Sequence, residues 1–450
     1  MNTLTEGSIF VDEAPEQLTL AEVLNVAMQL HQENRFELAE EIYRAVLEQA
    51  PESPDALHFF GLLRHQAGHW QEGVELICKA IELAPAYIDA YNNLGNIYMQ
   101  TGQLELAEQT FRKVIALRPK FAPAYGNLGV VLTKLERYDD AVSVLLEAIG
   151  IEPQTAHYYQ NLGNTLGKKG DYAEAISSYR KALTLRPYDP ETYKSLSRTF
   201  YLMGNIVNAI EVLDQWLVFD PGEPTAAHLR SAYTGEAVPE RASDDYVRQT
   251  FDGFADSFDS VLKRLDYKAP FLVQKALKQR CDDAAQLKIL DAGCGTGLCG
   301  ALLRPMAKSL IGVDLSPKML ERARARKVYD ELFEAELTEF FARGQGAYDA
   351  VTCADTFCYF GDLAPAFQSA LLALQPGGWF IFTLEKLEDG EAVQDFRLNL
   401  HGRYSHAPDY LERSLSAAGF NLLNTESVVL RSEFDKPVEG ILAVAQAPIR

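Results

Sequence analysis

The stretch that decides the fold of the C-terminal half is KILDAGCGTGLCG, residues 288–300. An apolar strand is predicted to run into Asp291, and Gly293, Gly295 and Gly297 then form a tight turn before a helix. Glycine suits such a turn because a side chain there would push a ligand away from the backbone. Taken alone, a glycine-rich turn is a weak signal that would equally suit a dinucleotide site.

Strand-like runs that follow the turn alternate with helical segments. A run at 310–313 ends at Asp314 in IGVDLSPKML, and a run at 332–337 carries Glu336 in FEAEL. A fourth strand is expected in AYDAVTCADTFCYF and a fifth in LQPGGWFIFTLE. This alternation predicts an α/β domain with a mainly parallel sheet.

The order of these motifs, with the form DAGCGTG, resembles the class I S-adenosylmethionine-dependent methyltransferases. That family uses G-x-G-x-G where most dehydrogenases use G-x-G-x-x-G. The resemblance spans about residues 244–446 and implies a Rossmann-like α/β domain with a mainly parallel seven-stranded sheet. The runs 421–430 and 438–446 suit the antiparallel pair that closes such a sheet. The resemblance also implies S-adenosylmethionine as cofactor and transfer of its methyl group as activity.

Cofactor contacts are implied by the resemblance at the turn and at the ends of the next two strands. Asp291 would orient the cofactor's amino group, Asp314 would hold its ribose, and Glu336 would meet its adenine. For each carboxylate the alternative is a helix N-cap or a turn residue. The cofactor-binding residues implied are Asp291, Gly293, Gly295, Gly297, Asp314, Leu315, Met319, Glu336 and Leu337.

Candidate catalytic residues lie in two places. Asp355, just past the fourth strand, lies where the family faces the reactive methyl group. The segment HGRYSHAPDYLERSLSAAGF places His401, Arg403, Tyr404 and His406 together, and His401 or His406 could take a proton from a hydroxyl or amine. Tyr404 completes the predicted catalytic set. For His401 and His406 the alternative is that an exposed histidine has no catalytic role, which is the more frequent case.

The residues after the fourth strand narrow the choice of methyl acceptor. They read ADTFCY, and no asparagine-proline-proline-tyrosine or aspartate-proline-proline-tyrosine signature is present. This weakens methylation of an amide or adenine nitrogen and leaves carboxylate, hydroxyl, amine and carbon acceptors open.

Upstream of the glycine turn, DDYVRQTFDGFADSFDSVLKRLDYKAP carries Phe251, Phe254 and Phe258 at near-helical spacing. This segment is similar to bacterial methyltransferases fused to tetratricopeptide repeats. In related enzymes it folds over the cofactor as a lid that shields the sulfonium from water. The alternative is an amphipathic helix that only packs on the sheet.

A repeat of 34 residues dominates the N-terminal half. Small residues recur in one register, where two helices must approach closely. Prolines recur at the same interval and would close each second helix, because proline cannot continue one. The prolines are Pro51, Pro85, Pro119, Pro153, Pro187 and Pro221, and the small residues are Ala39, Gly73, Ala107, Ala141, Ala175 and Ala209.

This pattern resembles the tetratricopeptide (TPR) family of helix-turn-helix repeats, which stack into an all-α superhelix, a solenoid with a concave groove. Six units fit between about residues 20 and 223, and residues 224–234 are expected to form a capping helix. The predicted organisation is a disordered lead over 1–19, a TPR array over 20–234, a linker over 235–243 and a methyltransferase domain over 244–450.

One register of the array carries asparagine two places before a glycine position. An amide side chain donates and accepts at once, which suits an extended peptide of any sequence. A similar asparagine ladder grips peptide backbone in the TPR arrays of O-linked N-acetylglucosamine transferases. The alternative is that the amides bond to neighbouring turns, and Phe59 and Ser195 interrupt the series. The predicted partner-binding residues are Asn25, Asn93, Asn127 and Asn161.

Composition excludes several other classes of protein. The formal net charge of −21 would repel a phosphate backbone, so no nucleic-acid partner is expected. No apolar run approaches the roughly 18 residues of a membrane span, the N-terminus lacks the features of a secretory signal, and a cytoplasmic location is expected. The six cysteines lack partners at metal-ligand spacing, so no metal is predicted.

Three hypotheses of function follow from the sequence. The first is a methyltransferase whose array presents a protein or peptide substrate. The second is a small-molecule methyltransferase that its repeats dock to an assembly. The third is a non-catalytic scaffold that senses S-adenosylmethionine.

Overall fold

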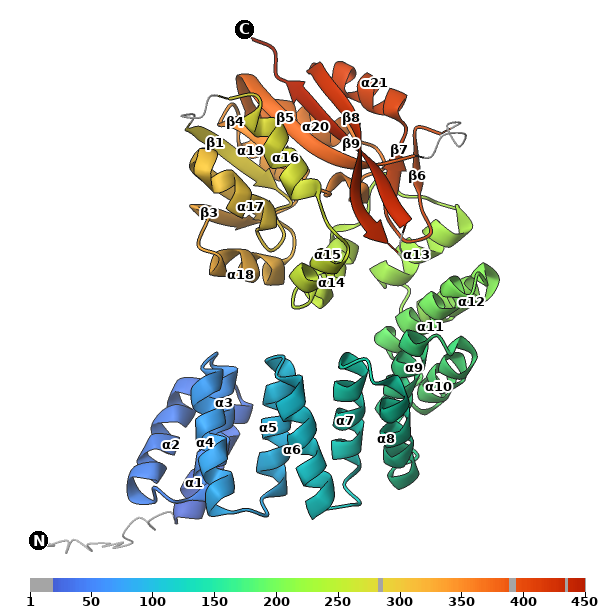
Figure 1. The fold of residues 1–450 in the computed structure, drawn as a ribbon. Helices are drawn as coiled ribbons and strands as arrows, with labels where there is room; N and C mark the ends of the chain where they lie inside the picture. The colour runs from blue at the N-terminus through green and yellow to red at the C-terminus, as the bar shows by residue number, and fades with distance from the viewer. Residues whose placement is uncertain (1–18, 282–285, 388–393, 434–435, 450) are drawn as a thin grey trace, which may run out of the picture. The chain divides into compact units, whose positions relative to one another are not determined.

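The computed structural model describes residues 19–281, 286–387, 394–433 and 436–449 (Figure 1). The chain divides into two compact units, Met1–Met203 and Gly204–Arg450. The predicted disordered lead falls almost wholly outside the described residues, which begin at Thr19, the N-cap of the first helix. No described helix is both long and apolar enough to cross a membrane.

The first unit is built of helices joined by short turns, as the 34-residue period predicts (Figure 1). Each second helix ends two residues before one of the repeated prolines, which confirms their role as terminators. The helices are α1 (Leu20–Gln32), α2 (Phe36–Gln49), α3 (Pro54–Gln66), α4 (Trp70–Leu83), α5 (Ile88–Gln100), α6 (Leu104–Leu117), α7 (Ala122–Lys134), α8 (Tyr138–Ile151), α9 (Ala156–Lys169), α10 (Tyr172–Leu185) and α11 (Pro190–Leu202).

Glycines in the first helix of four of the pairs, in α3, α5, α7 and α9, let the second helix come close. A Cβ atom on Gly129 would lie 2.5 Å from Cγ of Leu145, and one on Gly163 would lie 2.6 Å from Cε1 of Tyr179. Leu145 and Tyr179 fill the space that the missing side chains leave, and both are buried. The repeat pattern therefore encodes close helix packing as well as helix length.

The second unit begins with two helices that continue the repeat pattern, α12 (Ile206–Phe219) and α13 (Pro224–Thr234). Further helices and strands of an α/β domain follow. The helices are α14 (Asp244–Phe254), α15 (Phe258–Arg264), α16 (Ala269–Lys278), α17 (Leu298–Leu303), α18 (Pro317–Ala325), α19 (Leu337–Arg343), α20 (Ala364–Ala373) and α21 (Pro408–Ala418), with short 3₁₀ turns η1 (Arg304–Met306) and η2 (Phe357–Tyr359). The strands are β1 (Leu287–Ala292), β2 (Ala307–Asp314), β3 (Glu331–Glu334), β4 (Tyr348–Cys353), β5 (Leu374–Lys386), β6 (Phe396–Leu398), β7 (Tyr404–His406), β8 (Asn421–Glu433) and β9 (Lys436–Gln446).

The strands of the second unit form one sheet, in which β3, β2, β1, β4 and β5 are parallel neighbours in that order. β9 pairs antiparallel with β5 and with β8, which confirms the predicted closing pair. These seven strands are the predicted sheet. Two three-residue strands, β6 and β7, are added to it, and β7 runs parallel to the last residues of β5.

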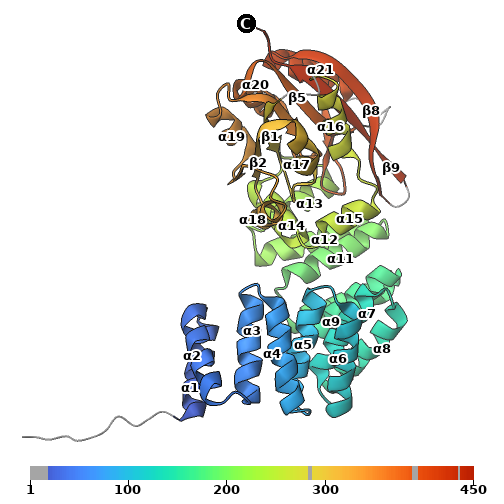
Figure 2. The ribbon, with the colours of Figure 1, turned by 60° about the vertical axis from the view of Figure 1, so that its left-hand side comes forward.

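Helices cover both faces of the sheet. α16 and α17 lie side by side on one face, where Ile289 of β1 joins Leu277 and Leu303 in one apolar core (Figure 2). The next residue of β1, Leu290, belongs to the core that α19, α20 and α21 cover on the other face. Successive side chains of a strand point to opposite faces, so β1 is apolar on both sides.

Residues 235–243, predicted as a linker, make backbone contacts with the α/β domain. The carbonyl oxygen of Glu240 accepts the backbone N–H of Gly361 at 2.8 Å, and Arg241 forms an antiparallel bridge with Phe360. Upstream, in α13, the His228 ring lies 2.9 Å (Nε2) from the carbonyl oxygen of Gly402. α13 and the segment after it thus pack against the α/β domain within the second unit.

Candidate active site

The predicted cofactor residues follow β1, β2 and β3, and the parallel strands bring their carboxyl ends to one edge of the sheet. Gly293, Gly295 and Gly297 all have positive φ angles, at 72°, 53° and 87°. These glycines form the turn that the sequence predicts. A Cβ on Gly293 would lie 2.2 Å from Oγ1 of Thr356, whereas one on Gly295 would meet only the Phe258 ring, at 3.8 Å. The turn therefore leaves room beside its backbone at Gly295.

Asp314 holds the glycine turn from the end of β2. Its Oδ2 accepts the backbone N–H of Gly295 at 2.9 Å, and its Oδ1 accepts that of Ser316 at 2.9 Å. Burial raises the pKa of Asp314, and these two N–H groups oppose the rise. Each carboxylate oxygen accepts one of these bonds and keeps lone-pair capacity for a further donor.

Asp291, near the end of β1, is almost fully buried. Its Oδ2 accepts the hydroxyl of Tyr329 at 2.7 Å, and its Oδ1 has no hydrogen-bond partner among the described residues. Burial raises the pKa of Asp291 to about 7, against the effect of the Tyr329 hydroxyl. A buried carboxylate oxygen without a donor is costly, so this atom is suited to receive one from a ligand.

Glu336 lies just beyond β3, which ends three residues earlier than the predicted strand. Its Oε2 accepts the backbone N–H of Glu339 and caps α19. Its Oε1 is buried without a hydrogen bond among the described residues, 3.7 Å from Nη1 of Arg241. Glu336 thus serves as the N-cap that was its alternative role and still offers one oxygen.

The apolar residues predicted beside the adenine lie in different settings. Leu315, directly after β2, is half-buried. Met319 of α18 is fully buried, and Leu337 at the start of α19 belongs to the core on the other side of the sheet. Leu315 is therefore the most accessible of the three.

α14 and α15 hold the predicted lid segment and lie against the glycine turn and α18. Phe258 faces Gly295, and Phe251 packs edge-on against Tyr359. Three aspartates of this segment contact residues between Thr296 and Arg326, the part of the domain that carries the glycine turn and α18, called here the cofactor half. Asp252 accepts the Ser316 hydroxyl at 2.5 Å, Asp259 accepts the Thr296 hydroxyl at 2.5 Å and pairs with Arg326, and Asp256 pairs with Arg322.

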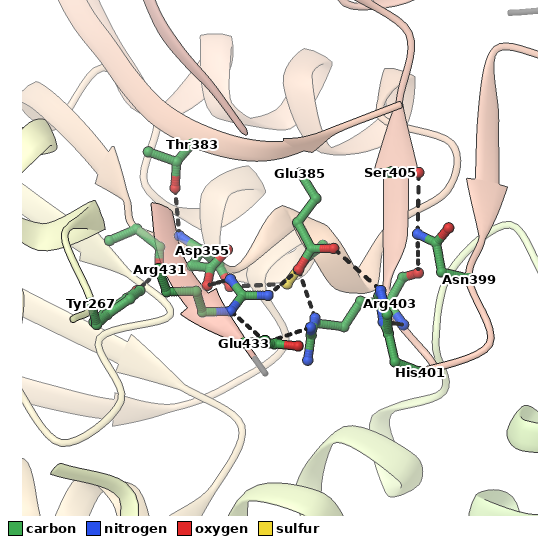
Figure 3. A network of polar contacts seen from close by, with 12 residues as sticks. Tyr267, Asp355, Thr383, Glu385, Asn399, His401, Arg403, Ser405, Arg431 and Glu433 are labelled. Carbon is green, nitrogen blue, oxygen red and sulfur yellow. Dashed lines mark hydrogen bonds and ion pairs between the residues drawn. The ribbon is translucent and has the colours of Figure 1, made fainter. Parts of the chain in front are cut away.

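A network of charged side chains lies at the carboxyl ends of β4 and β5 (Figure 3). Its centre is Arg431 of β8, of which only 3% is exposed. Arg431 donates from Nη1 to Oδ2 of Asp355 at 2.6 Å, from Nη2 to Glu385, and from Nε to Glu433 at 2.7 Å. Arg403 donates to the same two glutamates, at 2.6 Å and 2.7 Å.

The pKa values of two buried carboxylates in this network, Glu385 and Asp355, shift in opposite directions. Burial alone would raise the pKa of Glu385, but Arg403 and Arg431 outweigh it and hold that pKa at about 2. Burial raises the pKa of Asp355. The cation of Arg431 opposes this rise, and the negative charge of Glu385 adds to it. Glu385 is therefore a fixed negative charge, whereas Asp355 is the carboxylate better able to take a proton.

His401 lies at the edge of the network. Its Nε2 lies 3.7 Å from Glu385, and its Nδ1 accepts the backbone N–H of Arg403 at 3.3 Å. Burial and the charge of Arg403 lower the pKa of His401 to about 4. A neutral ring that accepts at Nδ1 carries its proton on Nε2, toward Glu385, so this arrangement does not favour His401 as a base.

Tyr404 and His406, also predicted as catalytic, lie in β7 and are fully buried. The Tyr404 hydroxyl donates to the carbonyl of Pro239 at 2.7 Å, and Nε2 of His406 lies 3.1 Å from the carbonyl of Gly361. Burial lowers the pKa of His406 to about 4. Both side chains are engaged in packing β7, and a catalytic role for either stays a prediction.

In the repeat unit, the predicted asparagine ladder is partly engaged within the array. The side-chain nitrogen of Asn93 lies 2.9 Å from Nε2 of His58, and that of Asn127 donates to Oδ1 of Asn96 at 3.0 Å. Asn25 is exposed and Asn161 is half-buried. The hydrogen bonds of Asn93 and Asn127 agree with the alternative interpretation, in which the amides bond to neighbouring turns of the array.

Sequence reasoning missed Glu385, Arg431 and the three lid aspartates. Glu385 stands at the end of a long apolar strand, and Arg431 interrupts the last part of another. A charged residue in such a run is a signal, although it does not identify the partner. Among the described residues no disulfide bond is formed, and Cys294, Cys299, Cys353 and Cys358 are buried.

The chain matches the family model of a methyltransferase domain over residues 261–425. Tetratricopeptide repeat models match residues 88–121, 120–187 and 168–233. Together with the two units of the fold, these matches show that the chain joins tetratricopeptide repeats to a methyltransferase domain.

Individual relatives are similar to part of the chain. The human methyltransferase-like protein 27 is 39% identical over 128 residues, which are 28% of this chain and 50% of the relative. A ubiquinone biosynthesis O-methyltransferase of Thiobacillus denitrificans is 32% identical over 21% of this chain and 43% of its own length. The biotin biosynthesis bifunctional protein BioHC of Saccharophagus degradans is 29% identical over 35% of this chain and 28% of its own length. The chain thus spans half or less of these relatives.

Among solved structures, pilF of Pseudomonas aeruginosa aligns with a TM-score of 0.41 at 17% identity, covering 47% of this chain and 96% of that chain. YrrB, described as a TPR protein with an unusual peptide-binding site, aligns with a TM-score of 0.35 at 22% identity, covering 42% and 97%.

Proposed function

We propose that the second unit is an S-adenosylmethionine-dependent methyltransferase. The observation that carries this proposal is the glycine turn after β1, where only the Phe258 ring approaches Gly295, bonded through its backbone to Asp314 at the end of β2. This arrangement leaves backbone and carboxylate oxygens facing the same edge of the sheet, where ligands bind in such folds.

The residues present fit the cofactor that the domain implies. When bound, S-adenosylmethionine supplies a methyl carbon activated by a positively charged sulfur. Asp291 Oδ1 and Glu336 Oε1 are buried and lack hydrogen-bond donors among the described residues. They suit the amino groups of the methionine and adenine portions, and Asp314 has the capacity to accept from ribose hydroxyls.

Methyl transfer needs alignment and the exclusion of water more than acid–base help. The lid helices α14 and α15 place Phe258 over Gly295, and Phe251 against Tyr359 next to the loop that carries Asp355. An aromatic cover of this kind would keep water from the reacting carbon and lower the local dielectric around it.

The proposal is tested by transfer of isotope-labelled methyl from S-adenosylmethionine into an extract of the source cells. We expect the full-length protein to label at least one component. We expect Asp314→Ala to reduce labelling at least tenfold, because one carboxylate makes the ribose contacts. Asp409→Ala, which changes an exposed carboxylate in α21, is the matched control. The absence of labelling by the wild-type protein, or full labelling by Asp314→Ala, would contradict the proposal.

We further propose that the repeats bind an extended protein or peptide segment through the asparagine register. The exposed Asn25 and the half-buried Asn161 support this, although Asn93 and Asn127 also bond within the array. The first two hypotheses differ in the role of that segment. In the first it is the methyl acceptor, and in the second it belongs to an assembly to which a small-molecule methyltransferase docks.

Panning of a random peptide library on the full-length protein tests this second proposal. We expect the wild type to enrich peptides without a single consensus, because amides grip the peptide backbone. The double variant Asn127→Ala, Asn161→Ala should lose at least tenfold in affinity, whereas Lys113→Ala on the exposed side of α6 should not. Equal enrichment by the double variant would argue that the amides only hold the array together.

A further inference from the structure

Asp355 stands out among the carboxylates of the site because of its backbone. It follows β4 with a φ angle of 60°, a left-handed conformation that residues other than glycine seldom adopt. Its backbone N–H donates to the Thr383 hydroxyl at 2.8 Å. The next residue, Thr356, packs on Gly293 and donates to the carbonyl of Ala292. This strained position therefore holds Asp355 against the glycine turn.

The two oxygens of Asp355 differ. Oδ2 accepts a charged hydrogen bond from Arg431 at 2.6 Å. Oδ1 is buried and has no hydrogen-bond partner among the described residues. Leaving a buried carboxylate oxygen without a donor costs free energy, so Oδ1 is suited to a ligand group that carries a hydrogen.

The other charges of the network restrict which group that is. Every guanidinium nitrogen from which Arg431 and Arg403 are shown to donate points to a carboxylate of the network. Two guanidinium groups face three carboxylates, and His401 is neutral near pH 7. An anionic acceptor would add a negative charge to a network that already has an excess of one, which is unfavourable at short distance.

We infer that the methyl acceptor is a hydroxyl or amine nucleophile whose proton passes to Asp355 Oδ1, and that Arg431 and Glu385 are positioning residues for Asp355. This inference rests on the proposed methyl transfer. The acceptor oxygen or nitrogen forms a bond to the methyl carbon, and the carbon–sulfur bond breaks with its electron pair left on sulfur. The acceptor proton moves to Asp355, which becomes neutral.

Arg431 acts through Asp355 by holding Oδ2, which leaves Oδ1 toward the acceptor. Glu385, in turn, holds both guanidinium groups. The titratable and charged groups around Asp355 are Arg431 and Glu433 of β8, Glu385 of β5, Arg403 before β7, Tyr267 before α16, Cys353 of β4, and Cys358 and Tyr359 of η2. His401 lies beside Glu385 at the edge of this group.

Loss of the Arg431 cation should therefore change the pH dependence of turnover as well as its size. Asp355 must be ionised to take the proton, so turnover falls at low pH through the pKa of Asp355. Removal of the cation disfavours the ionised form and raises this pKa further. We expect the acidic limb of the kcat profile to move to higher pH in Arg431→Gln and much less in Arg431→Lys. A purely structural role would lower kcat without moving the limb.

The class of acceptor is tested on the full-length protein with methyl-labelled S-adenosylmethionine and extract of the source cells. After the reaction, mild alkali releases methyl esters as volatile labelled methanol but leaves ethers and methylamines intact. We expect non-volatile label. We also expect Asp355→Asn to lower transfer at least a hundredfold while its affinity for S-adenosylhomocysteine stays within twofold of the wild type. Asp395→Asn, at an exposed carboxylate paired with Arg413, is the control and should leave transfer unchanged.

The outcomes separate this inference from the function on which it rests. Volatile label, undiminished transfer by Asp355→Asn, or a tenfold loss of S-adenosylhomocysteine affinity in that variant would overturn the inference and leave methyl transfer standing. The last result would place Asp355 on the cofactor. If the wild-type protein moves no label, methyl transfer itself fails and the inference fails with it.

Discussion

Asp291, Asp314 and Asp355 lie at the carboxyl ends of three neighbouring parallel strands, and burial raises the pKa of each, but their partners differ. Asp314 accepts two backbone N–H groups, Asp291 accepts a tyrosine hydroxyl, and Asp355 accepts a guanidinium donor. Backbone donors fix a carboxylate in place, whereas a mobile proton needs an oxygen that is free. These environments suggest a binding role for Asp314 and a proton-accepting role for Asp355.

The same residue-level comparison shows what the sequence could reveal of the site. The positions of Asp291 and Asp314 at the carboxyl ends of β1 and β2 were predictable because each of these strands ends where its apolar run ends, whereas the role of both residues toward a cofactor stays a prediction. Tyr404 and His406 were chosen because they cluster at the carboxyl end of the predicted sheet, but every residue of β7 is buried. Arg431 contacts Glu385, 46 residues earlier in the chain, and no local pattern reveals this pairing.

At the residue scale, the close packing of the repeats predicts opposite effects for two glycines of neighbouring helices. A Cβ on Gly129 would lie 2.5 Å from Leu145, so Gly129→Ala should destabilise the protein by about 1–3 kcal/mol through overpacking. A Cβ on Gly150 in α8 would have nothing within 4 Å, so Gly150→Ala should stabilise the protein by roughly 0.5–1 kcal/mol. Chemical denaturation of the first unit's transition measures both, and equal effects of the two changes would refute the packing argument.

Among the elements, the lid helices α14 and α15 have a polar side that the aromatic pattern did not predict. Asp252, Asp256 and Asp259 each bond a different part of the cofactor half, from Thr296 to Arg326. The two ion pairs among these contacts, Asp256–Arg322 and Asp259–Arg326, are partly exposed and contribute little individually, about 0–1 kcal/mol each. Together they would oppose opening of the lid and so slow the exchange of cofactor.

Asp259→Asn should therefore speed the dissociation of S-adenosylhomocysteine by about two- to fivefold, as expected from the loss of up to 1 kcal/mol. Stopped-flow displacement measures this rate. Asp245→Asn, at a residue of α14 that pairs with Arg248 in the same helix, should leave this rate unchanged. Higher salt should reduce the difference between wild type and Asp259→Asn, because salt screens the pairs. An unchanged rate in Asp259→Asn would show that these contacts do not restrain the lid.

Element boundaries show the limit of pattern reasoning. The third strand was predicted over 332–337, but β3 ends at Glu334 because Glu336 caps α19. The strands β6 and β7 are three residues long and exist only because they pair with each other and with the end of β5. Short strands of this kind depend on tertiary contacts, which no local period contains.

For the whole molecule, most of the architecture was predictable because two strong periods dominate the sequence. The 34-residue repeat predicts the helical hairpins, and the alternation of strands and helices predicts the sheet with its antiparallel closing pair. The point of division was less predictable. The first compact unit ends at Met203, although the repeat pattern continues through α12 and the repeat models match as far as residue 233.

The role of α13 within the second unit has a practical consequence. His228 of α13 contacts Gly402, close to Arg403 and His401 of the charged network, and stacks on Tyr246 of α14. A fragment that begins at residue 241 would lose these contacts. Comparisons of the repeats with the catalytic unit are therefore best made with substitutions in the full-length chain.

The most direct test of a methyltransferase site at this sheet edge is calorimetric titration of S-adenosylhomocysteine into the full-length protein. We predict one site per chain, with affinity reduced about 10- to 100-fold in Asp314→Ala, since hydrogen bonds to a charged group contribute about 1.5–3 kcal/mol each. Asp409→Ala should bind like the wild type. No measurable heat with the wild-type protein, or equal affinity in Asp314→Ala, would contradict the assignment of the site.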